Sequence, residues 1–334
     1  MRIHQKCYPV FLLLLACLGG ACSWTNPKER PGPLLNHVAL DLETPPAFNF
    51  VAFGDTRFHD PSDTEPANPA VRRALVAAID EVHPAFVSIS GDIVYSGENA
   101  KDWQVWDSET AAWREHKIVV YPALGNHDLK GERKALGNYF ARFPYLNNSR
   151  FYSVSLGNSQ VLVLDSSLEE ISGPQGDWLG SRLEQLPRST DFVFFVFHHP
   201  PYTSSSDERT FGGGHSARSK EQALAKFLEE RQRHTRARFV VFSGHVHNYE
   251  RHEHGAVTYF VTGGGGAHPY PIVRQPSDLY KDPGVNYNYL LAEVDRNRLA
   301  VTMNKLEFKD GKPVWSKPDS VTITAPLALP ATAD

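Results

Sequence analysis

The chain has 334 residues, of which 41% are hydrophobic and 22% charged, a composition typical of a folded globular protein rather than a disordered one. Its formal net charge of −4 argues against a nucleic-acid-binding protein, which needs a basic surface to contact phosphates. All three cysteines, Cys7, Cys17 and Cys22, lie near the start, so the body of the chain has no disulfide, thiolate zinc site or cysteine nucleophile.

Residues 1–22 have the pattern of a secretory signal peptide. Arg2 and Lys6 precede an apolar run over 10–18, which is too short to span a bilayer, and small residues and a cysteine follow. The sequence therefore predicts an exported protein, which is periplasmic or an outer-membrane lipoprotein if its source is bacterial.

Two cysteines of this segment match the position that carries lipid in bacterial lipoproteins. Cys22 fits better than Cys17, because it leaves a longer apolar run and precedes a polar segment with a proline. Cleavage without lipid is the alternative, and a lipid here would be the only link to a membrane. After this point we expect a flexible tether over 23–46, one folded domain over 47–326 and a C-terminal tail over 327–334.

The expected domain contains five short runs of β-branched and aromatic residues. Such nearly continuous apolar runs are typical of strands that are buried on both faces. The runs lie at 48–53, 85–90, 118–123, 192–197 and 239–242.

Helical periods lie between these runs. Apolar residues recur at helical spacing over 71–82 and 224–231, which predicts crossover helices. Two further pairs of runs, 151–156 with 160–164 and 290–294 with 299–303, are joined by short polar turns and predict hairpins. The alternation predicts an α/β fold around a mostly parallel sheet.

Each of the five apolar runs ends in polar side chains that do not belong in a core. A glycine precedes four of the five polar groups and allows the backbone to turn sharply over the strand end. In open α/β sheets, ligands bind at the carboxyl edge, where the loops diverge. We therefore expect one site, built from Asp55, Asp92, Tyr95, Asn126, His198, His245 and His247.

This set of two carboxylates, an amide, three imidazoles and a phenol contains no sulfur and suits iron, manganese or zinc. Seven side chains are too many for one tetrahedral ion but suit two ions that share a carboxylate. Two cations about 3.5 to 4 Å apart form a clamp for in-line displacement at phosphorus. The set therefore predicts hydrolysis of phosphate esters.

The five polar segments, in this order, resemble the motifs of the calcineurin-like metallophosphoesterases. Gly-Asp-Ile-Val-Tyr at 91–95 and Gly-His-Val-His-Asn-Tyr-Glu-Arg at 244–251 make the purple acid phosphatase branch the nearest likeness. The resemblance implies a four-layer α/β/β/α sandwich with a dinuclear metal site at the carboxyl ends of the strands. It also implies an acid phosphatase-like hydrolase.

The resemblance implies a ligand set for each metal. The first metal would be held by Asp55, Asp92, Tyr95 and His247, and the second by Asp92, Asn126, His198 and His245, with Asp92 bridging. A phenolate favours ferric iron in the first position, so the expected cofactors are Fe(III) with zinc, manganese or Fe(II). No nucleotide or organic cofactor is expected.

In the mechanism that the resemblance implies, a metal-bound hydroxide attacks phosphorus opposite the leaving alcohol. His127, beside the ligand Asn126, would bind substrate, stabilise the transition state and protonate the leaving oxygen, while Asp128 would orient its ring. We expect a phosphatase for small phosphate monoesters. Phosphodiester or nucleotide hydrolysis is the near alternative. A non-catalytic metal-binding lipoprotein is an alternative of another class, against which the pair His127 and Asp128 argues.

The chain departs from the family pattern at two places. Arg57 stands where many members have histidine, and it would either bind the substrate phosphate or pair with a nearby carboxylate. The stretch 202–208 lacks the substrate-binding histidines of plant purple acid phosphatases, and His215 is the nearest substitute. We expect His199 to be a loop residue or a group that supports the ligands, rather than a ligand itself, because adjacent residues of an extended segment point in opposite directions.

Overall fold

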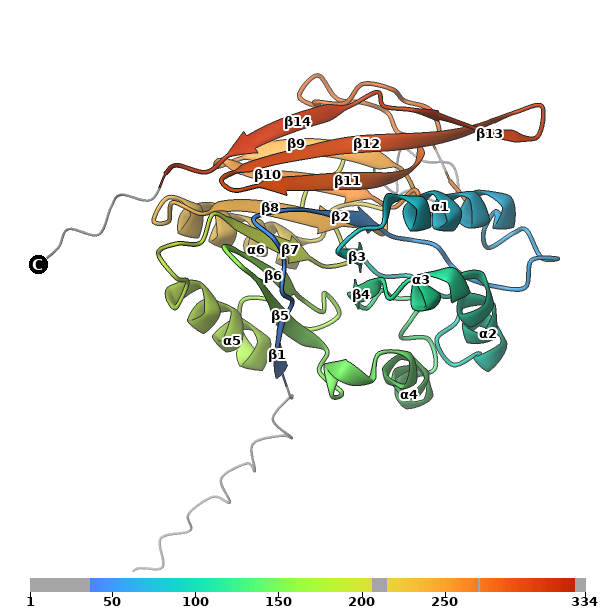
Figure 1. The fold of residues 1–334 in the computed structure, drawn as a ribbon, viewed down its shortest axis with the longest axis horizontal. Helices are drawn as coiled ribbons and strands as arrows, with labels where there is room; N and C mark the ends of the chain where they lie inside the picture. The colour runs from blue at the N-terminus through green and yellow to red at the C-terminus, as the bar shows by residue number, and fades with distance from the viewer. Residues whose placement is uncertain (1–36, 206–214, 270, 328–334) are drawn as a thin grey trace, which may run out of the picture. The chain divides into compact units, whose positions relative to one another are not determined.

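The computed structural model describes residues 37–205, 215–269 and 271–327, and the statements below concern this part of the chain. It contains two seven-stranded sheets (Figure 1). In spatial order, the strands of the first sheet are β1 (His37–Asp41), β5 (Phe151–Leu156), β6 (Ser159–Val163), β7 (Phe192–Val196), β8 (Arg238–Ser243), β10 (Val257–Thr262) and β9 (Tyr249–His254). Those of the second are β13 (Lys312–Ser316), β12 (Arg298–Lys309), β11 (Tyr287–Asp295), β2 (Ala47–Phe53), β3 (Phe86–Ile89) and β4 (Val119–Pro122), and β14 (Ser320–Thr324) also pairs with β12.

Both sheets are mixed. Neighbouring strands run parallel from β6 through β7 and β8 to β10 in the first sheet, and from β2 through β3 to β4 in the second. The predicted hairpins are present as the antiparallel pairs β5–β6 and β11–β12. The five predicted apolar strands are thus confirmed as β2, β3, β4, β7 and β8, but they divide between two sheets instead of sharing one.

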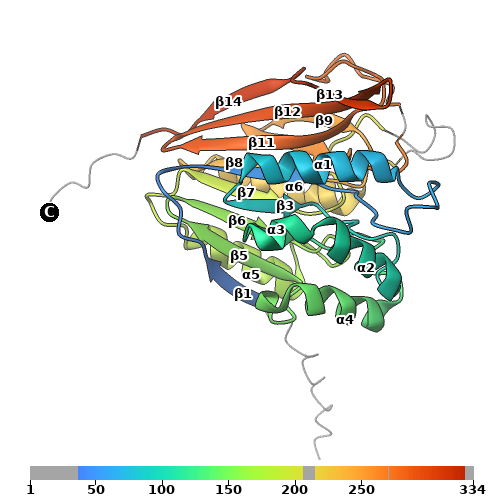
Figure 2. The same cartoon turned by 45° about the vertical axis from the view of Figure 1, so that its right-hand side comes forward.

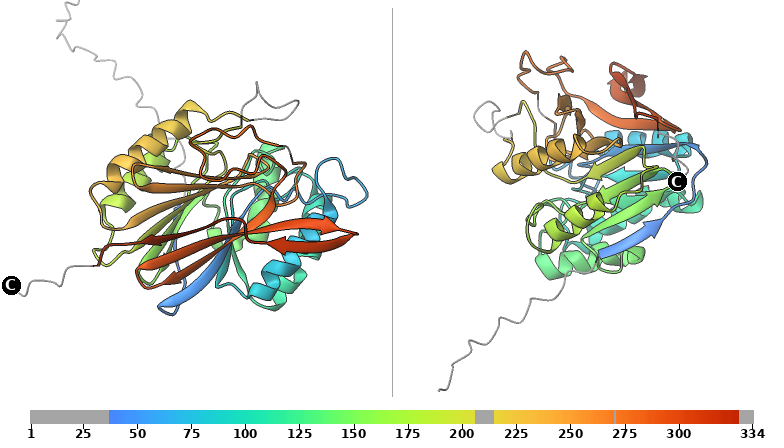
Figure 3. Two further views of the ribbon diagram at one scale, coloured as in Figure 1. Left: turned by 90° about the horizontal axis from the view of Figure 1, so that it is seen from above. Right: turned by 90° about the vertical axis from the view of Figure 1, so that its left-hand side faces the viewer.

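Helices cover the outer faces of the paired sheets. They are α1 (Pro69–Val82), α2 (Ala100–Glu109), α3 (Ala111–Glu115), α4 (Glu132–Arg142), α5 (Gly173–Glu184) and α6 (Ser219–Gln232), with a short 3-10 helix at Pro144–Leu146. The helices α1 to α4 lie on the side of the second sheet, whereas α5 and α6 lie on the side of the first (Figures 2 and 3). The layer order is therefore helix, sheet, sheet, helix, as the resemblance implies.

Aromatic rings join the two sheets at the centre of the sandwich. Phe50 of β2 lies with its ring centroid 4.9 Å from that of Phe194 on β7 and 5.8 Å from that of Phe242 on β8. All three side chains are buried. Because aromatic burial and ring pairing stabilise a core strongly, this contact fixes the faces that the two sheets turn toward each other.

The sequence of α1 shows why a helix forms over a buried strand. The side chain of Asn68 accepts hydrogen bonds from the first backbone N–H groups, and Pro69 follows at the first helical position, where a missing N–H costs nothing. Leu75 and Ile79 then recur on the buried face, and the helix ends at His83, which has left-handed backbone angles. Capping and periodicity therefore agree with the prediction over 71–82.

Several strands lie where no apolar run predicts one. The segment over 37–41, within the expected tether, forms β1 and pairs in parallel with β5, with half-buried Val38 and Leu40 alternating with exposed neighbours. Because β1 lies at the edge of the sheet and only alternate side chains are covered, its sequence contains no continuous apolar run that would predict a strand. Residues 1–36, which include the expected signal peptide and both candidate lipid sites, lie outside the described residues. None of the helices in the described ranges is long and apolar enough to cross a membrane.

Candidate metal centre

The polar side chains predicted from the strand ends come together across the two sheets. Asp55, Asp92 and Asn126 follow β2, β3 and β4 of the second sheet, whereas His198, His245 and His247 follow β7 and β8 of the first. The side chains form two neighbouring groups, and Asp92 belongs to the first and contacts His198 of the second. The carboxyl edges of both sheets therefore contribute to one centre.

Three of these residues have left-handed backbone angles, with φ of 59° at Asp55, 53° at Asp92 and 69° at His245. This conformation costs a residue other than glycine about 1 to 3 kcal/mol and persists only where the surroundings enforce it. Here the backbone N–H of Asp55 donates to the carbonyl of Gly91 at 3.0 Å, and that of His245 donates to Asp55 Oδ2 at 2.9 Å. The strain at three ligand positions is typical of a functional site.

Two glycines allow the loops to approach this closely. A Cβ atom on Gly125 would lie 2.3 Å from Asp92 Oδ1 and 2.2 Å from the backbone nitrogen of the same residue. A Cβ atom on Gly263, in the run of four glycines, would lie 2.2 Å from the carbonyl oxygen of Val246. The run of four glycines thus allows the chain leaving β10 to pack closely against the loop that carries His247.

The first group consists of Asp55, Asp92 and His247, whose ligand atoms lie within 4.8 Å of one another. Nε2 of His247 lies 3.6 Å from Asp55 Oδ1, and its Nδ1 lies 2.6 Å from the carbonyl oxygen of His268. Since a carbonyl only accepts, Nδ1 carries the hydrogen, and the lone pair of the neutral ring is on Nε2. Asp55 Oδ1 is buried and has no hydrogen-bond partner within the described ranges, as expected of an atom that meets a cation.

The second group contains Asn126, His198 and His245, with Asp92 at its edge. His198 Nδ1 lies 2.9 Å from the carbonyl oxygen of Ser90, which again places the lone pair on Nε2. That atom lies 2.9 Å from Asn126 Oδ1, 3.2 Å from His245 Nδ1 and 3.4 Å from Asp92 Oδ1. The lone pair of His198 Nε2 faces the oxygens of Asn126 and Asp92, and such acceptors repel one another unless a cation lies among them, so the geometry fits a metal ion.

The charges of the two groups support the same conclusion. Burial and the neighbouring Asp92 carboxylate raise the pKa of Asp55 well above its usual value. At Asp92 burial acts in the same direction, but neighbouring groups, among them the Arg57 guanidinium and the backbone N–H of His127, lower the pKa of the carboxyl. Burial also lowers the pKa of His198 and His245, which keeps both imidazoles neutral, the form that binds metals.

Comparison with known proteins agrees with this arrangement. The family model described as calcineurin-like phosphoesterase matches residues 48–249. The chain belongs to this family. The chain is 26% identical over 205 residues to phosphoenolpyruvate phosphatase of Allium cepa, and 28% identical over 185 residues to purple acid phosphatase 15 of Arabidopsis thaliana. The matches cover 56% and 50% of this chain but only 39% and 33% of the relatives, so the chain spans well under half their length.

The solved structure of the purple acid phosphatase PPD1 from yellow lupin (Lupinus luteus) has the same fold. It matches with a TM-score of 0.62 and 17% identity, over 83% of this chain and 54% of the lupin chain. The predicted likeness to purple acid phosphatases is thereby confirmed. Relatives of this kind imply a site for two metal ions, and the two groups described above are its candidate ligands.

The remaining predicted residues lie around the two groups. Arg57 pairs with Asp92, since its Nε and Nη2 lie 3.3 and 3.2 Å from Asp92 Oδ2, so of the two roles left open for this side chain the structure shows the ion pair. The ring of Tyr95 has three neighbours: His59 and His127, at centroid distances of 5.0 and 5.3 Å, and the Lys130 ammonium 4.6 Å from its centroid. A bond from Tyr95 to a metal stays a prediction.

His127 is oriented by a different group from the one predicted. Its Nδ1 lies 2.7 Å from the carbonyl oxygen of Tyr95, and its backbone N–H donates to Asp92 Oδ1 at 2.8 Å. The carboxylate of Asp128 instead accepts hydrogen bonds from the backbone N–H groups of Ile93, Val94 and Gly125, at 2.9, 3.2 and 2.9 Å. Asp128 is thus occupied in holding the loops after β3 and β4 together, which leaves the His127 ring to the Tyr95 carbonyl.

Two further histidines lie beside His245. The ring of His215, the predicted substitute for the missing substrate contacts, has its centroid 4.1 Å from that of His245. His199 lies at 4.3 Å and has a ligand atom within 4.8 Å of those of His198 and His245. Sequence reasoning placed His199 behind the ligands. That prediction assumed that successive side chains point in opposite directions, as in a strand. The strand β7 ends at Val196, so this alternation does not apply to His198 and His199.

A buried network supports His199 from behind. Its Nδ1 lies 2.8 Å from Ser166 Oγ, and the same oxygen accepts from the His199 backbone N–H at 3.2 Å. Arg218 donates from Nη2 to the Ser166 carbonyl at 2.7 Å and from Nε to Glu221 Oε2 at 2.9 Å. Glu170 is buried nearby, and burial together with the Glu221 charge raises its pKa to about 8. This network joins the start of α6 to the loop after β6.

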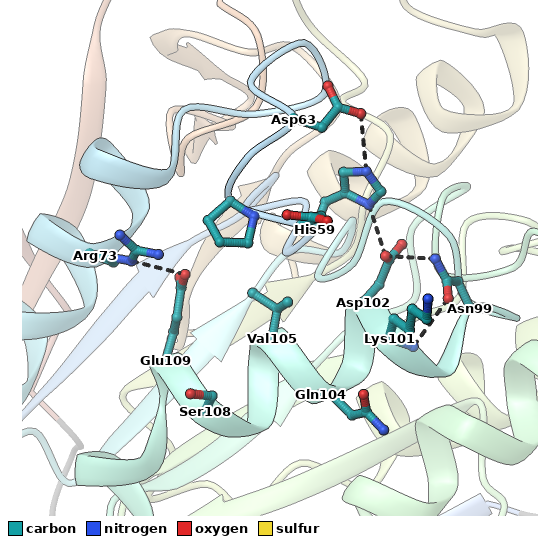
Figure 4. Close-up of a pocket in the computed structure, with 12 residues that line it drawn as sticks. His59, Asp63, Arg73, Asn99, Lys101, Asp102, Gln104, Val105, Ser108 and Glu109 are labelled. Carbon is teal, nitrogen blue, oxygen red and sulfur yellow. Dashed lines mark hydrogen bonds and ion pairs between the residues drawn. The ribbon is translucent and has the colours of Figure 1, made fainter.

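A pocket of about 800 Å³ lies on the His59 side of Tyr95 (Figure 4). His59 points between two carboxylates, with Nδ1 2.8 Å from Asp102 and Nε2 3.2 Å from Asp63. Asp102 also accepts from the Asn99 side chain at 2.8 Å. These hydrogen bonds fix the orientation of the His59 ring, which packs against the ring of Tyr95.

Proposed function

We propose that the protein is a phosphatase that hydrolyses small phosphate monoesters at a site for two metal ions. The convergence of lone pairs on His198, Asn126 and Asp92 carries this proposal, since without a cation it is unfavourable. When bound, the two ions would activate water and neutralise charge on the phosphoryl oxygens. The names of the relatives, phosphoenolpyruvate phosphatase and purple acid phosphatase, support a monoester as substrate.

His127 is the acid/base group in this proposal. Its Nδ1–H is held by the Tyr95 carbonyl, so Nε2 is the atom that exchanges a proton with the leaving oxygen. Burial lowers the pKa of His127 to about 4, which makes the ring neutral in the free protein. A phosphate dianion raises the proton affinity of a neighbouring imidazole, so substrate binding favours the protonated form that the leaving group needs.

Metal identity and cellular location complete the proposal. A ferric ion beside Tyr95 with zinc, manganese or ferrous iron in the second group is supported by the purple acid phosphatase relatives and by a donor set without sulfur. Export rests on the pattern of residues 1–22, and attachment to a membrane rests on Cys22 or Cys17. The folded domain is proposed to extend over 37–326 rather than over 47–326, since residues 37–41 pair with β5 and do not belong to a flexible tether.

Metal analysis and substrate assays test this function together. The purified protein is analysed for iron, zinc and manganese and assayed with 4-nitrophenyl phosphate and bis(4-nitrophenyl) phosphate. We expect two metals per chain, a visible absorption band that Tyr95→Phe removes, and faster turnover of the monoester. Asp92→Asn should abolish turnover and metal binding, whereas Asp177→Asn, at an exposed position on α5, should change neither. Turnover of the diester alone would contradict the monoesterase, and undiminished turnover in Asp92→Asn would contradict the site.

A further inference from the structure

Lys130 is a cation at the site, and no carboxylate within the described ranges forms an ion pair with it. It lies in the loop between β4 and α4, three residues after His127. Its Nζ lies 3.4 Å from Nε2 of that ring, the nitrogen that can accept a hydrogen bond, and 2.8 Å from Nδ1, whose hydrogen points at the Tyr95 carbonyl. The same ammonium lies over the ring of Tyr95. The carboxylates of Asp92 and Asp102 act on its charge without forming an ion pair with it.

Arg57 is a second cation near Lys130, but it has a carboxylate partner. Arg57 contributes to a lowered pKa of Lys130, after burial, which shows that the two positive charges repel each other. Arg57 is compensated by its two contacts with Asp92 Oδ2. No carboxylate in the described part of the chain pairs with Lys130 in this way, and its side chain is exposed, so an anion from solution can reach it.

The position of Lys130 indicates which part of a substrate it meets. His127 exchanges a proton with the leaving oxygen in the function proposed above, and Lys130 contacts the same imidazole. Lys130 therefore lies beside the group that protonates the leaving oxygen, over the face of the Tyr95 ring. One ammonium balances one negative charge, which matches a carboxylate better than a second phosphate dianion.

We propose that Lys130 binds a carboxylate on the leaving alcohol, so that the preferred substrates are phosphate monoesters with a carboxylate close to the ester oxygen. This inference rests on the proposed phosphatase function. It makes Lys130 a residue that determines substrate specificity. Hydrogen bonds from an ammonium to a carboxylate are among the strong ones, and their geometry favours a fixed position of the leaving group.

The test compares substrates that differ only in charge. Carboxymethyl phosphate and its carboxamide, and their homologues one carbon longer, have the same phosphate and nearly the same size. The ratio of kcat/KM for carboxylate over carboxamide is measured in the wild-type protein, Lys130→Met, Lys130→Arg and Lys134→Met, an exposed lysine of α4 that serves as control. A ratio within one protein is insensitive to the fraction of molecules that fold.

For one of the two chain lengths, we expect the wild-type protein to favour the carboxylate by about tenfold or more, mainly through KM. Lys130→Met should bring the ratio close to one, Lys130→Arg should retain most of it, and Lys134→Met should leave it at the wild-type value. Calorimetric binding of phosphonate analogues, which are not hydrolysed, should give the same pattern in Kd.

Three results would overturn the proposal. A wild-type ratio near one for both chain lengths, with turnover of the carboxamide, rejects the carboxylate site but leaves the phosphatase in place. A ratio that Lys130→Met does not lower also rejects it. Failure to hydrolyse the carboxamides, the carboxylates and 4-nitrophenyl phosphate in the metal-loaded protein rejects the proposed function, and the carboxylate site with it.

Discussion

Replacing Glu170 by glutamine should change how the stability of the protein depends on pH. The Glu170 side chain is buried beside Glu221, which accepts a hydrogen bond from Arg218 Nε at 2.9 Å. Its pKa is raised from 4.5 to about 8 by burial and by the Glu221 charge, so the folded chain retains a proton that the unfolded chain releases near pH 4.5. The stabilising contribution is complete below the unfolded pKa and is lost as the pH rises through the folded pKa. A difference of this size corresponds to about 2 to 5 kcal/mol.

Glutamine has the shape of the protonated acid and does not ionise, so Glu170→Gln should remove this dependence. Urea unfolding followed by circular dichroism between pH 5 and pH 9 gives the free energy of unfolding of each protein. We expect wild type and variant to be similar at pH 5 and the variant to be more stable at pH 8.5. Glu169→Gln, at the exposed neighbouring position, should follow the wild type. If the curves of wild type and Glu170→Gln run parallel, Glu170 is not held in its protonated form.

Three further predictions concern the metal centre and its support. Removing metals with a chelator should lower Tm, and restoring them should raise it again in proportion to their concentration, because ions that bind only the folded state stabilise it; an unchanged Tm would contradict the site. Gly125→Ala should reduce the metal content measured by elemental analysis, because its Cβ would lie 2.3 Å from Asp92 Oδ1, whereas Gly137→Ala in α4, where a Cβ meets nothing within 4 Å, should retain it. Ser166→Ala should lower the free energy of unfolding by about 1 to 3 kcal/mol, because the buried His199 backbone N–H loses its acceptor and the ring nitrogen Nδ1 loses its hydrogen-bond partner; a loss below the error of denaturant titration would show that water replaces the hydroxyl.

The ligand motifs were predictable because each one follows a buried strand. Asp55, Asp92, Asn126, His198 and His245 share the signal of an apolar run that ends abruptly in a polar side chain, and parallel strands bring such ends together. The division of these strands between two sheets is not visible in this signal. A run such as 192–197 is buried on both faces whether a helix or another sheet covers it, so its composition is the same in either case.

The residues that support the site were less predictable. Asp128 is adjacent to His127 in the chain, which suggests that it orients that ring, yet its carboxylate binds backbone N–H groups of loops brought close only by the fold. Lys130 carries no motif, and its significance comes from its approach to the imidazole. The strand β9 was missed because its sequence, Tyr-Glu-Arg-His-Glu-His, is polar, as an edge strand allows.

The arrangement of the ligands over two sheets has a consequence for biogenesis. Asp55 emerges early during synthesis, whereas His247 follows about 190 residues later. A growing or truncated polypeptide that stops before β8 lacks His245 and His247, and with them a candidate ligand of each metal group. The full ligand set therefore exists only after β8 and the loop that follows it have been made.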